Sequence, residues 1–170
     1  LISSGQGLMV LCAAMLADEG KSPVEICQAL GEYRERIFSS FLVSGTATLH
    51  RNGKVSGGVN RLCTLLDLHP ILSMSKNRLK LWRIESGNMH RAVRQYIKML
   101  FKHSRQIDTR VLFITYAGCT VKQIDEIARI VEKYIHFDKV ILQKASATVS
   151  SNCGIGTFGL MFVRKEKQEP

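Results

Sequence analysis

An apolar strand–helix–strand pattern in the last third of the chain limits its fold more than any other feature. Residues 110–116 are almost continuously apolar, which is typical of a strand buried on both faces. Residues 121–135 carry apolar side chains at helical spacing, and residues 139–142 have the composition of a second strand. A crossover of this length allows the two strands to pair in parallel. The pattern therefore predicts an α/β fold.

The rest of the chain fits the same fold class. Ser22 and Glu25 form a capping-box pattern with Pro23 in the first turn, which predicts a helix start. We expect helices over residues 7–20, 22–37, 46–49, 59–66 and 92–101, and strands over 37–43, 70–74, 79–84 and 158–163. We expect turns at 51–54, at Lys76-Asn77-Arg78 and at 150–156.

A change in the order of elements gives the best candidate for a domain boundary. Near residues 36–39 two helices give way to a mixture of strands and helices. This mixture predicts a two-layer α/β sandwich over residues 39–170. Residues 1–38 are then expected to be the helical end of a preceding domain. Because the chain starts at Leu1 with a loop-like stretch, we expect its N-terminal part to be missing.

The chain is strongly basic. Lys and Arg number 24 against 14 Asp and Glu, a formal charge of +10. Part of the excess can line the outer face of one expected helix, through Arg91, Arg94, Lys98, Lys102 and Arg105. Such a face can bind nucleic acid or an acidic membrane surface, but aromatic side chains do not alternate with these charges as single-strand binding requires. A solvated helix face is the preferred interpretation, and nucleic acid is not the expected partner.

The cysteines and the hydropathy indicate the compartment. Five cysteines without a CxxC pair indicate reduced thiols, so a cytoplasmic location is expected. No stretch approaches 18 unbroken apolar residues, so no membrane span is expected.

Residues that could carry chemistry are few. The sequence contains no GxSxG, Walker A or HExxH motif, and the turn at 117–120 lacks GxGxxG. The five histidines are scattered and are expected at surface or capping positions. We therefore expect no enzyme activity, no cofactor and no metal. A reading in which Cys153 is a nucleophile lacks an adjacent base. The stretch 152–156 contains two glycines and is either a ligand-binding loop or a simple connection.

Five short motifs follow one another in a defined order. They are Ser-Ser-Gly-Gln-Gly-Leu at 3–8, Ala-Asp-Glu-Gly-Lys-Ser at 17–22, Arg-Asn-Gly-Lys-Val-Ser at 51–56, Leu-Asp-Leu-His-Pro-Ile-Leu at 66–72 and Asn-Cys-Gly-Ile-Gly at 152–156. In order and spacing they resemble the DegV family of fatty-acid-binding proteins over nearly the whole chain. The resemblance implies two α/β domains that enclose one long-chain fatty acid and present its carboxylate to a separate bacterial fatty acid kinase. It also implies that the protein has no catalytic activity of its own.

The resemblance also implies a set of lipid-binding residues. Carried over onto this sequence they are Ser3, Lys54, Arg83, Asn152, Cys153, Gly154 and Gly156. The family's head-group-binding Ser and Thr in the first domain would lie upstream of this chain. Asn152 stands where members have a His, so a neutral donor is expected there. Gly87 stands where many members have an Arg. The alternative is a basic protein-interaction or nucleic-acid-associated module, which only the net charge supports.

Overall fold

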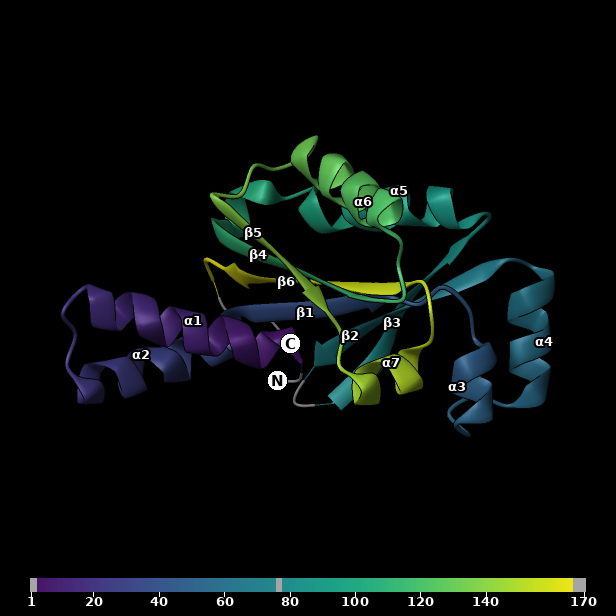
Figure 1. Ribbon diagram of the computed structural model, residues 1–170, viewed down its shortest axis with the longest axis horizontal. Coiled ribbons are helices and arrows are strands. Elements are labelled where there is room, and N and C mark those ends of the chain that lie inside the picture. Colours follow the sequence, from purple (N-terminus) through teal and green to yellow (C-terminus); the bar gives the residue numbers. More distant parts are fainter. Residues whose placement is uncertain (1–2, 76–77, 167–170) are drawn as a thin grey trace.

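The computed structural model describes residues 3–75 and 78–166. The helices are α1 (Ser4–Asp18), α2 (Pro23–Arg36), α3 (Ala47–Arg51), α4 (Gly57–Leu65), α5 (Met89–Phe101), α6 (Val121–Glu132) and α7 (Ala147–Cys153), with a 3-10 turn at Ser104–Gln106. The strands are β1 (Ile37–Leu42), β2 (Leu68–Ser75), β3 (Arg78–Ser86), β4 (Ile107–Ala117), β5 (Lys139–Lys144) and β6 (Thr157–Arg164). Figure 1 shows their arrangement.

One mixed sheet contains all six strands, in the order β3-β2-β1-β6-β4-β5. β4 and β5 pair in parallel from Val111 with Lys139 to Tyr116 with Lys144, which confirms the predicted crossover through α6. The other neighbouring strands pair antiparallel. The predicted α/β fold is therefore confirmed.

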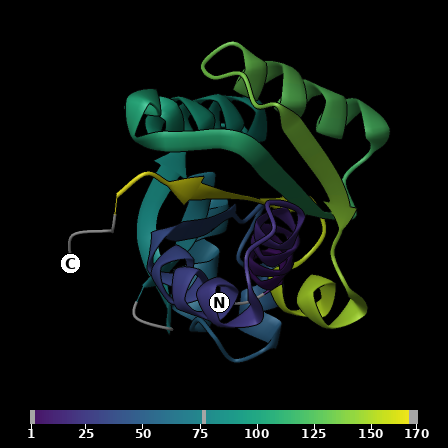
Figure 2. The same cartoon turned by 90° about the vertical axis from the view of Figure 1, so that its left-hand side faces the viewer.

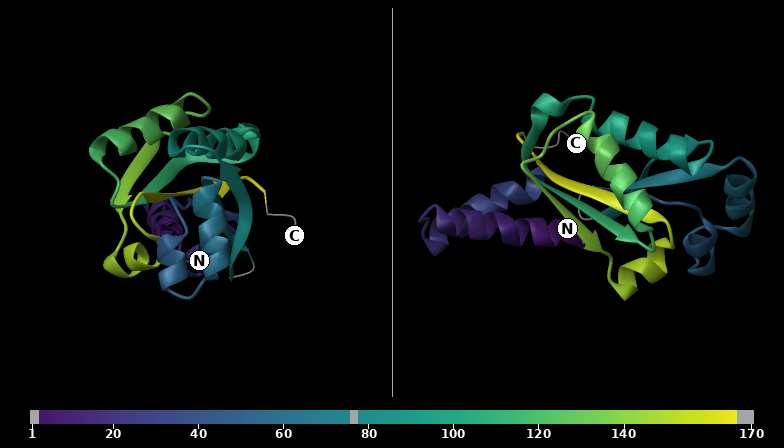
Figure 3. Two further views of the ribbon diagram at one scale, coloured as in Figure 1. Left: turned by 90° about the vertical axis from the view of Figure 1, so that its right-hand side faces the viewer. Right: turned by 45° about the horizontal axis from the view of Figure 1, so that its top comes forward.

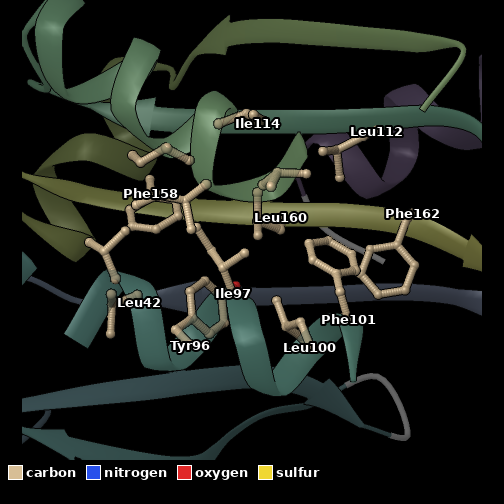
Figure 4. Packing of buried hydrophobic residues seen from close by; sticks show 14 of the residues in the cluster. Leu42, Tyr96, Ile97, Leu100, Phe101, Leu112, Ile114, Phe158, Leu160 and Phe162 are labelled. Carbon is tan, nitrogen blue, oxygen red and sulfur yellow. The ribbon is translucent and has the colours of Figure 1, made fainter. Parts of the chain in front are cut away.

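The larger core lies between the sheet and the helices α5 and α6 (Figure 2). Tyr96 and Phe101 of α5 lie on the β6 side chains Phe158 and Phe162, with ring centroids 5.6 and 5.5 Å apart (Figure 4). The Tyr96 hydroxyl shares a 2.8 Å hydrogen bond with Ser40 Oγ, so the polar end of this buried ring is satisfied.

A smaller core joins α1 to the opposite face of the sheet. Leu8 and Cys12 of α1 pack with Phe41, Phe113 and Met161. The helix α2 is held nearby, since Arg36 Nε donates to the Arg164 carbonyl at 2.7 Å. A division between residues 38 and 39 would fall inside β1, and the assignment of residues 1–38 to a preceding domain stays a prediction.

The helix α2 begins as predicted. Ser22 accepts from the Glu25 amide at 3.4 Å and the Glu25 carboxylate accepts from the Ser22 amide at 2.8 Å, which completes the capping box. Several bounds differ from the expectation: α1 begins at Ser4, and α6 ends at Glu132 rather than at 135. Two residues of the expected hairpin turn, Lys76 and Asn77, lie outside the described residues.

The turn expected at 150–156 is wrong over its first half. Residues Ala147–Cys153 form α7, capped by Ser146, whose Oγ accepts from the Val149 amide at 3.3 Å. The Thr, Val and Ser residues of this helix have low helix propensity, so the cap and the tertiary contacts with α3 stabilise it. Only Gly154–Gly156 remains as a loop before β6.

Candidate functional site

An exposed apolar surface lies on the α1 side of β2 and β3. Leu72 pairs with Leu81, Met74 with Leu79, and Phe41 of the α1-side core pairs with Leu72, so these side chains share one face. Leu79 and Leu81 are 49% and 58% exposed. Ile84, which pairs with Pro70 on the same face, is 44% exposed. We call these residues the apolar face.

A bulge in β2–β3 makes this surface continuous. The register shifts between Ile71 and Leu72, so Ile71 pairs with Arg83 while Leu72 pairs with Leu81. Trp82 is left between the two pairs. The alternation of side chains along β3 therefore shifts by one residue at the bulge. For this reason Leu79, Leu81 and Ile84 lie on one face of the sheet, although Ile84 comes three residues after Leu81.

The helix α4 extends the apolar surface at one end of the sheet. It packs on β2 and exposes Val59, Leu62 and Leu65, followed by the exposed Leu66. The helices α3, α4 and α7 gather at this end (Figure 3). Exposed apolar area of this extent is uncommon on a soluble surface and marks a place where another apolar group binds.

Polar groups converge at the end of β4. The Ser4 hydroxyl, at the first turn of α1, hydrogen bonds to Thr115 and donates to Gln143 Oε1 at 2.6 Å. Ser4 and Thr115 are both buried, so this contact fixes the start of α1 over β4 and β5. Ser3 precedes it with φ +50°, and its side chain makes no capping hydrogen bond. Sequence reasoning missed the contact of Ser4 with Thr115 and Gln143, because Ser4 is more than a hundred residues from both.

The loop Gly154–Gly156 reaches the same end of β4. The Gly156 amide donates to the Ala117 carbonyl at 2.7 Å and the Gly154 amide donates to Ser150 at 2.9 Å. Both glycines have positive φ, and a Cβ on Gly154 would lie 2.7 Å from Thr48 Oγ1. The glycines therefore let the loop pack closely on α3, and their amides are already bonded within the protein.

Two more of the expected site residues lie beside this loop. Asn152, in the last turn of α7, donates from Nδ2 to the Thr148 carbonyl at 2.8 Å. Lys54 is exposed just after α3, and α3 is joined to α7 by the 2.8 Å bond from Asn52 Nδ2 to the Ser151 carbonyl. The Asn152 amide, expected to donate to the lipid head group, thus donates to a carbonyl of its own helix. The Lys54 ammonium faces solvent.

Cys153 is half-buried beside Gly154. Burial raises the pKa of its thiol, so the reactive thiolate is disfavoured. The described residues contain no group of three or more His, Cys, Asp or Glu that could hold a metal. The raised pKa of the thiol opposes the reading of Cys153 as a nucleophile.

Arg83 lies on the other face of the sheet. Its Nε pairs with Glu85 Oε1 at 3.1 Å, and its Nη1 lies 3.6 Å from Met99 Sδ of α5. The structure therefore places Lys54 and residues 152–156 beside the contact of α3 with α7, Ser3 at the start of α1, and Arg83 on the other face of the sheet.

His69 is buried, unlike the surface position expected for it. Its Nδ1 lies 2.9 Å from the Ser44 carbonyl and its Nε2 lies 2.9 Å from the Gly87 carbonyl. Each ring nitrogen therefore lies within hydrogen-bond distance of a carbonyl oxygen, and Asp67 Oδ1 is 3.4 Å from Nε2. This ring joins the loop after β1 to the loop after β3. The loop of Gly156 lies next to them, since a Cβ added at Gly156 would lie 3.1 Å from Ser44 Cβ.

A family model described as an uncharacterised protein of the DegV family matches residues 1–165. The chain belongs to the DegV family. A DegV domain-containing protein of Clostridium perfringens is 24% identical over 173 residues, which cover 96% of this chain and 56% of that protein. One from Lactococcus lactis is 26% identical over 174 residues, covering 98% of this chain and 57% of the relative. The chain thus spans little more than half the length of these DegV relatives.

Solved DegV structures share the fold. A protein described by its fatty acid binding, from Thermus thermophilus, is 24% identical with a TM-score of 0.75, over 95% of this chain and 57% of that one. The fatty acid kinase B3 protein of Streptococcus pneumoniae, loaded with linoleic acid, is 19% identical with a TM-score of 0.73, over 92% and 54% of the two chains. The likeness supports the α/β architecture.

Proposed function

We propose that this DegV protein binds a long-chain fatty acid whose acyl chain lies against the apolar face. The observation that carries the proposal is the exposure of Leu79, Leu81 and Ile84 on one face of β3. An acyl chain on this surface removes apolar area of both partners from water, at about 25 cal/mol per Å². The other side of the acyl chain would be covered by a second α/β domain, for which the relatives' chains are long enough.

We place the carboxylate end near the start of α1 and the loop of Gly154 and Gly156. The uncapped Ser3 side chain and the exposed Lys54 ammonium are the donors available there, and a charge-assisted bond contributes about 1.5–3 kcal/mol. Asn152 and Cys153 shape the end of α7. Arg83 has no part in this proposal, because it pairs with Glu85 on the opposite face.

The proposed role is that of a binding protein in the cytoplasm that presents the fatty acid carboxylate to a separate fatty acid kinase. The name of the Streptococcus pneumoniae relative, a fatty acid kinase B3 protein, supports this partner. The described residues also contain no helix that is long and apolar enough to cross a membrane. The relatives reported above give no support to the nucleic-acid-associated alternative.

Mass spectrometry of lipid extracted from a bacterially made protein that carries these 170 residues within a chain of the relatives' length tests the proposal. Recovery of a stoichiometric fatty acid is expected. Leu81→Asp should reduce recovery about tenfold, because a carboxylate on the apolar face must be desolvated by the acyl chain. Leu142→Asp is the matched control: Leu142 is 50% exposed, pairs with Ile114 and lies on the opposite face. Equal losses for both variants, or no lipid from the unaltered protein, would contradict the proposal.

A further inference from the structure

A basic groove runs between α5 and α6, on the sheet face opposite the apolar face. It has a volume of about 430 Å³ and is lined by Arg94, Lys122, Arg129 and Lys133, with Ile130 and the pair of His90 and Glu126. His90 Nδ1 lies 2.5 Å from Glu126 Oε1. Four cations therefore face one carboxylate, and that carboxylate is already paired.

The charges on α5 are not balanced within the helix. Its residues 89–101 include Arg91, Arg94 and Lys98 and no Asp or Glu. Arg94 and Lys98 are one turn apart, as are Arg129 of α6 and Lys133, the C-cap residue of that helix. Each such like-charged pair destabilises a helix by about 0.2–0.5 kcal/mol. A negatively charged ligand in the groove would remove this repulsion.

An apolar pocket continues the groove toward the loop of Gly156. Its volume is about 140 Å³, and it is lined by Met89, Val93, Cys119, Ile127 and Phe158. His90 and Glu126 line both spaces, so the pocket and the basic groove are contiguous. The site thus combines a row of cations with one place for an apolar side chain of moderate size.

We propose that this groove binds an acidic segment of a partner protein, with one apolar side chain in the pocket and carboxylates along Arg94, Lys122, Arg129 and Lys133. Apolar anchors surrounded by complementary charge are the usual construction of such interfaces. A nucleic acid is disfavoured because the aromatic ring in the lining, Phe158, is 1% exposed and offers no stacking surface. A flat lipid surface cannot reach a pocket between two helices.

Fluorescence anisotropy with synthetic peptides tests this site. The probe is a labelled peptide of Glu and Ala with one central Leu, and a second peptide carries Ala in place of Leu. We expect the Leu peptide to bind about tenfold more tightly at 0.15 M salt. Arg94→Glu with Arg129→Glu should weaken it by at least about tenfold. Lys21→Glu with Lys139→Glu, exposed elsewhere and equal in charge change, should alter it less than about twofold.

Alkylation of Cys119 gives a local readout. The thiol lines the pocket, so the bound Leu peptide should slow its reaction with N-ethylmaleimide severalfold, whereas the exposed Cys27 should react unchanged. Equal weakening by the two double variants, or no protection of Cys119, would overturn the proposal. Stronger protection by an oligothymidylate or by phosphatidylglycerol vesicles would overturn it as well, in favour of those ligands. Because these outcomes do not depend on bound fatty acid, they are separate from the test of lipid binding.

Discussion

At the residue scale, Asp108 and Arg110 form the best-defined ion pair beneath α1 and α2. Arg110 Nη2 lies 2.6 Å from Asp108 Oδ2 and also donates to Tyr33 Oη at 3.0 Å. Burial by itself would raise the pKa of Asp108, but the hydrogen bonds from Arg110 outweigh it and the pKa is lowered. The carboxylate form is therefore the one that the folded protein favours.

Asp108→Asn should reduce the free energy of unfolding at pH 7 by about 1 kcal/mol, since the Arg110 side of the pair is partly exposed and screened. A carboxylate with a lowered folded pKa stabilises above its unfolded pKa, near 3.9, and loses that contribution as pH falls through the folded value. The difference between the two proteins in urea unfolding should therefore disappear in acid. Asp125→Asn, at an exposed position on α6, is the control and should change little. A difference that persists at pH 2 would contradict the assignment.

His69 is the second residue with a defined structural role. His69→Ala should lower the free energy of unfolding by about 2–3 kcal/mol, because the Ser44 and Gly87 carbonyls lose the ring nitrogens that lie 2.9 Å from them in a buried place. Hydrogen exchange should also rise in the loops after β1 and β3. His103→Ala, at an exposed position, should leave both measurements unchanged. Equal behaviour of the two variants would mean that His69 does not hold these loops.

At the element scale, Gly159 allows β6 to lie between β1 and β4. A Cβ at this position would collide with Phe41 Cδ1 and would lie 2.8 Å from the Ser40 carbonyl oxygen. Gly159→Ala should therefore destabilise the fold by about 2–3 kcal/mol, as overpacking against backbone does. Gly31→Ala, in α2, should stabilise it by about 0.5–1 kcal/mol, because the added Cβ would meet no atom within 4 Å beyond its chain neighbours and its own helix backbone. Thermal unfolding of the pair checks both signs, and a stable Gly159→Ala protein would contradict the packing.

Elements with clear periodicity were predictable, and those held by distant partners were not. The α6 stripe and the β4 run follow from local pattern, whereas α7 depends on its contacts with α3. The place of β6 between β1 and β4 depends on pairing across the whole chain. The sequence does not show the apolar face for a similar reason: the alternation in β3 breaks between Trp82 and Arg83, which lie on the same face, and only the bulge explains it. That phase change was the signal in the sequence that could have placed Arg83 on the other face.

At the scale of the whole molecule, the two faces of the sheet differ in what covers them. The helices α5 and α6 cover one face and present charge outward. On the other face α1 covers β4, β6 and β1, while β2 and β3 keep apolar side chains exposed. The proposed acyl chain and the proposed acidic segment therefore lie on opposite faces of the sheet, and the two sites approach each other at the loop of Gly156, which also lines the apolar pocket.

The exposure of the apolar face leads to a prediction about lipid retention. An acyl chain on these 170 residues contacts protein on one side and water on the other. Full burial contributes about 0.8 kcal/mol per CH₂, so a half-covered chain gains about half of that and is readily lost on purification. The same 170 residues within a chain of the relatives' length should retain fatty acid near one per protein, and the 170 residues by themselves much less. Lipid extraction and mass spectrometry of both proteins compare the two values. In the longer chain Leu81→Asp should reduce retention and Leu142→Asp should not. Equal retention by the longer chain and by the 170 residues alone would mean that the apolar face holds the acyl chain without a second domain.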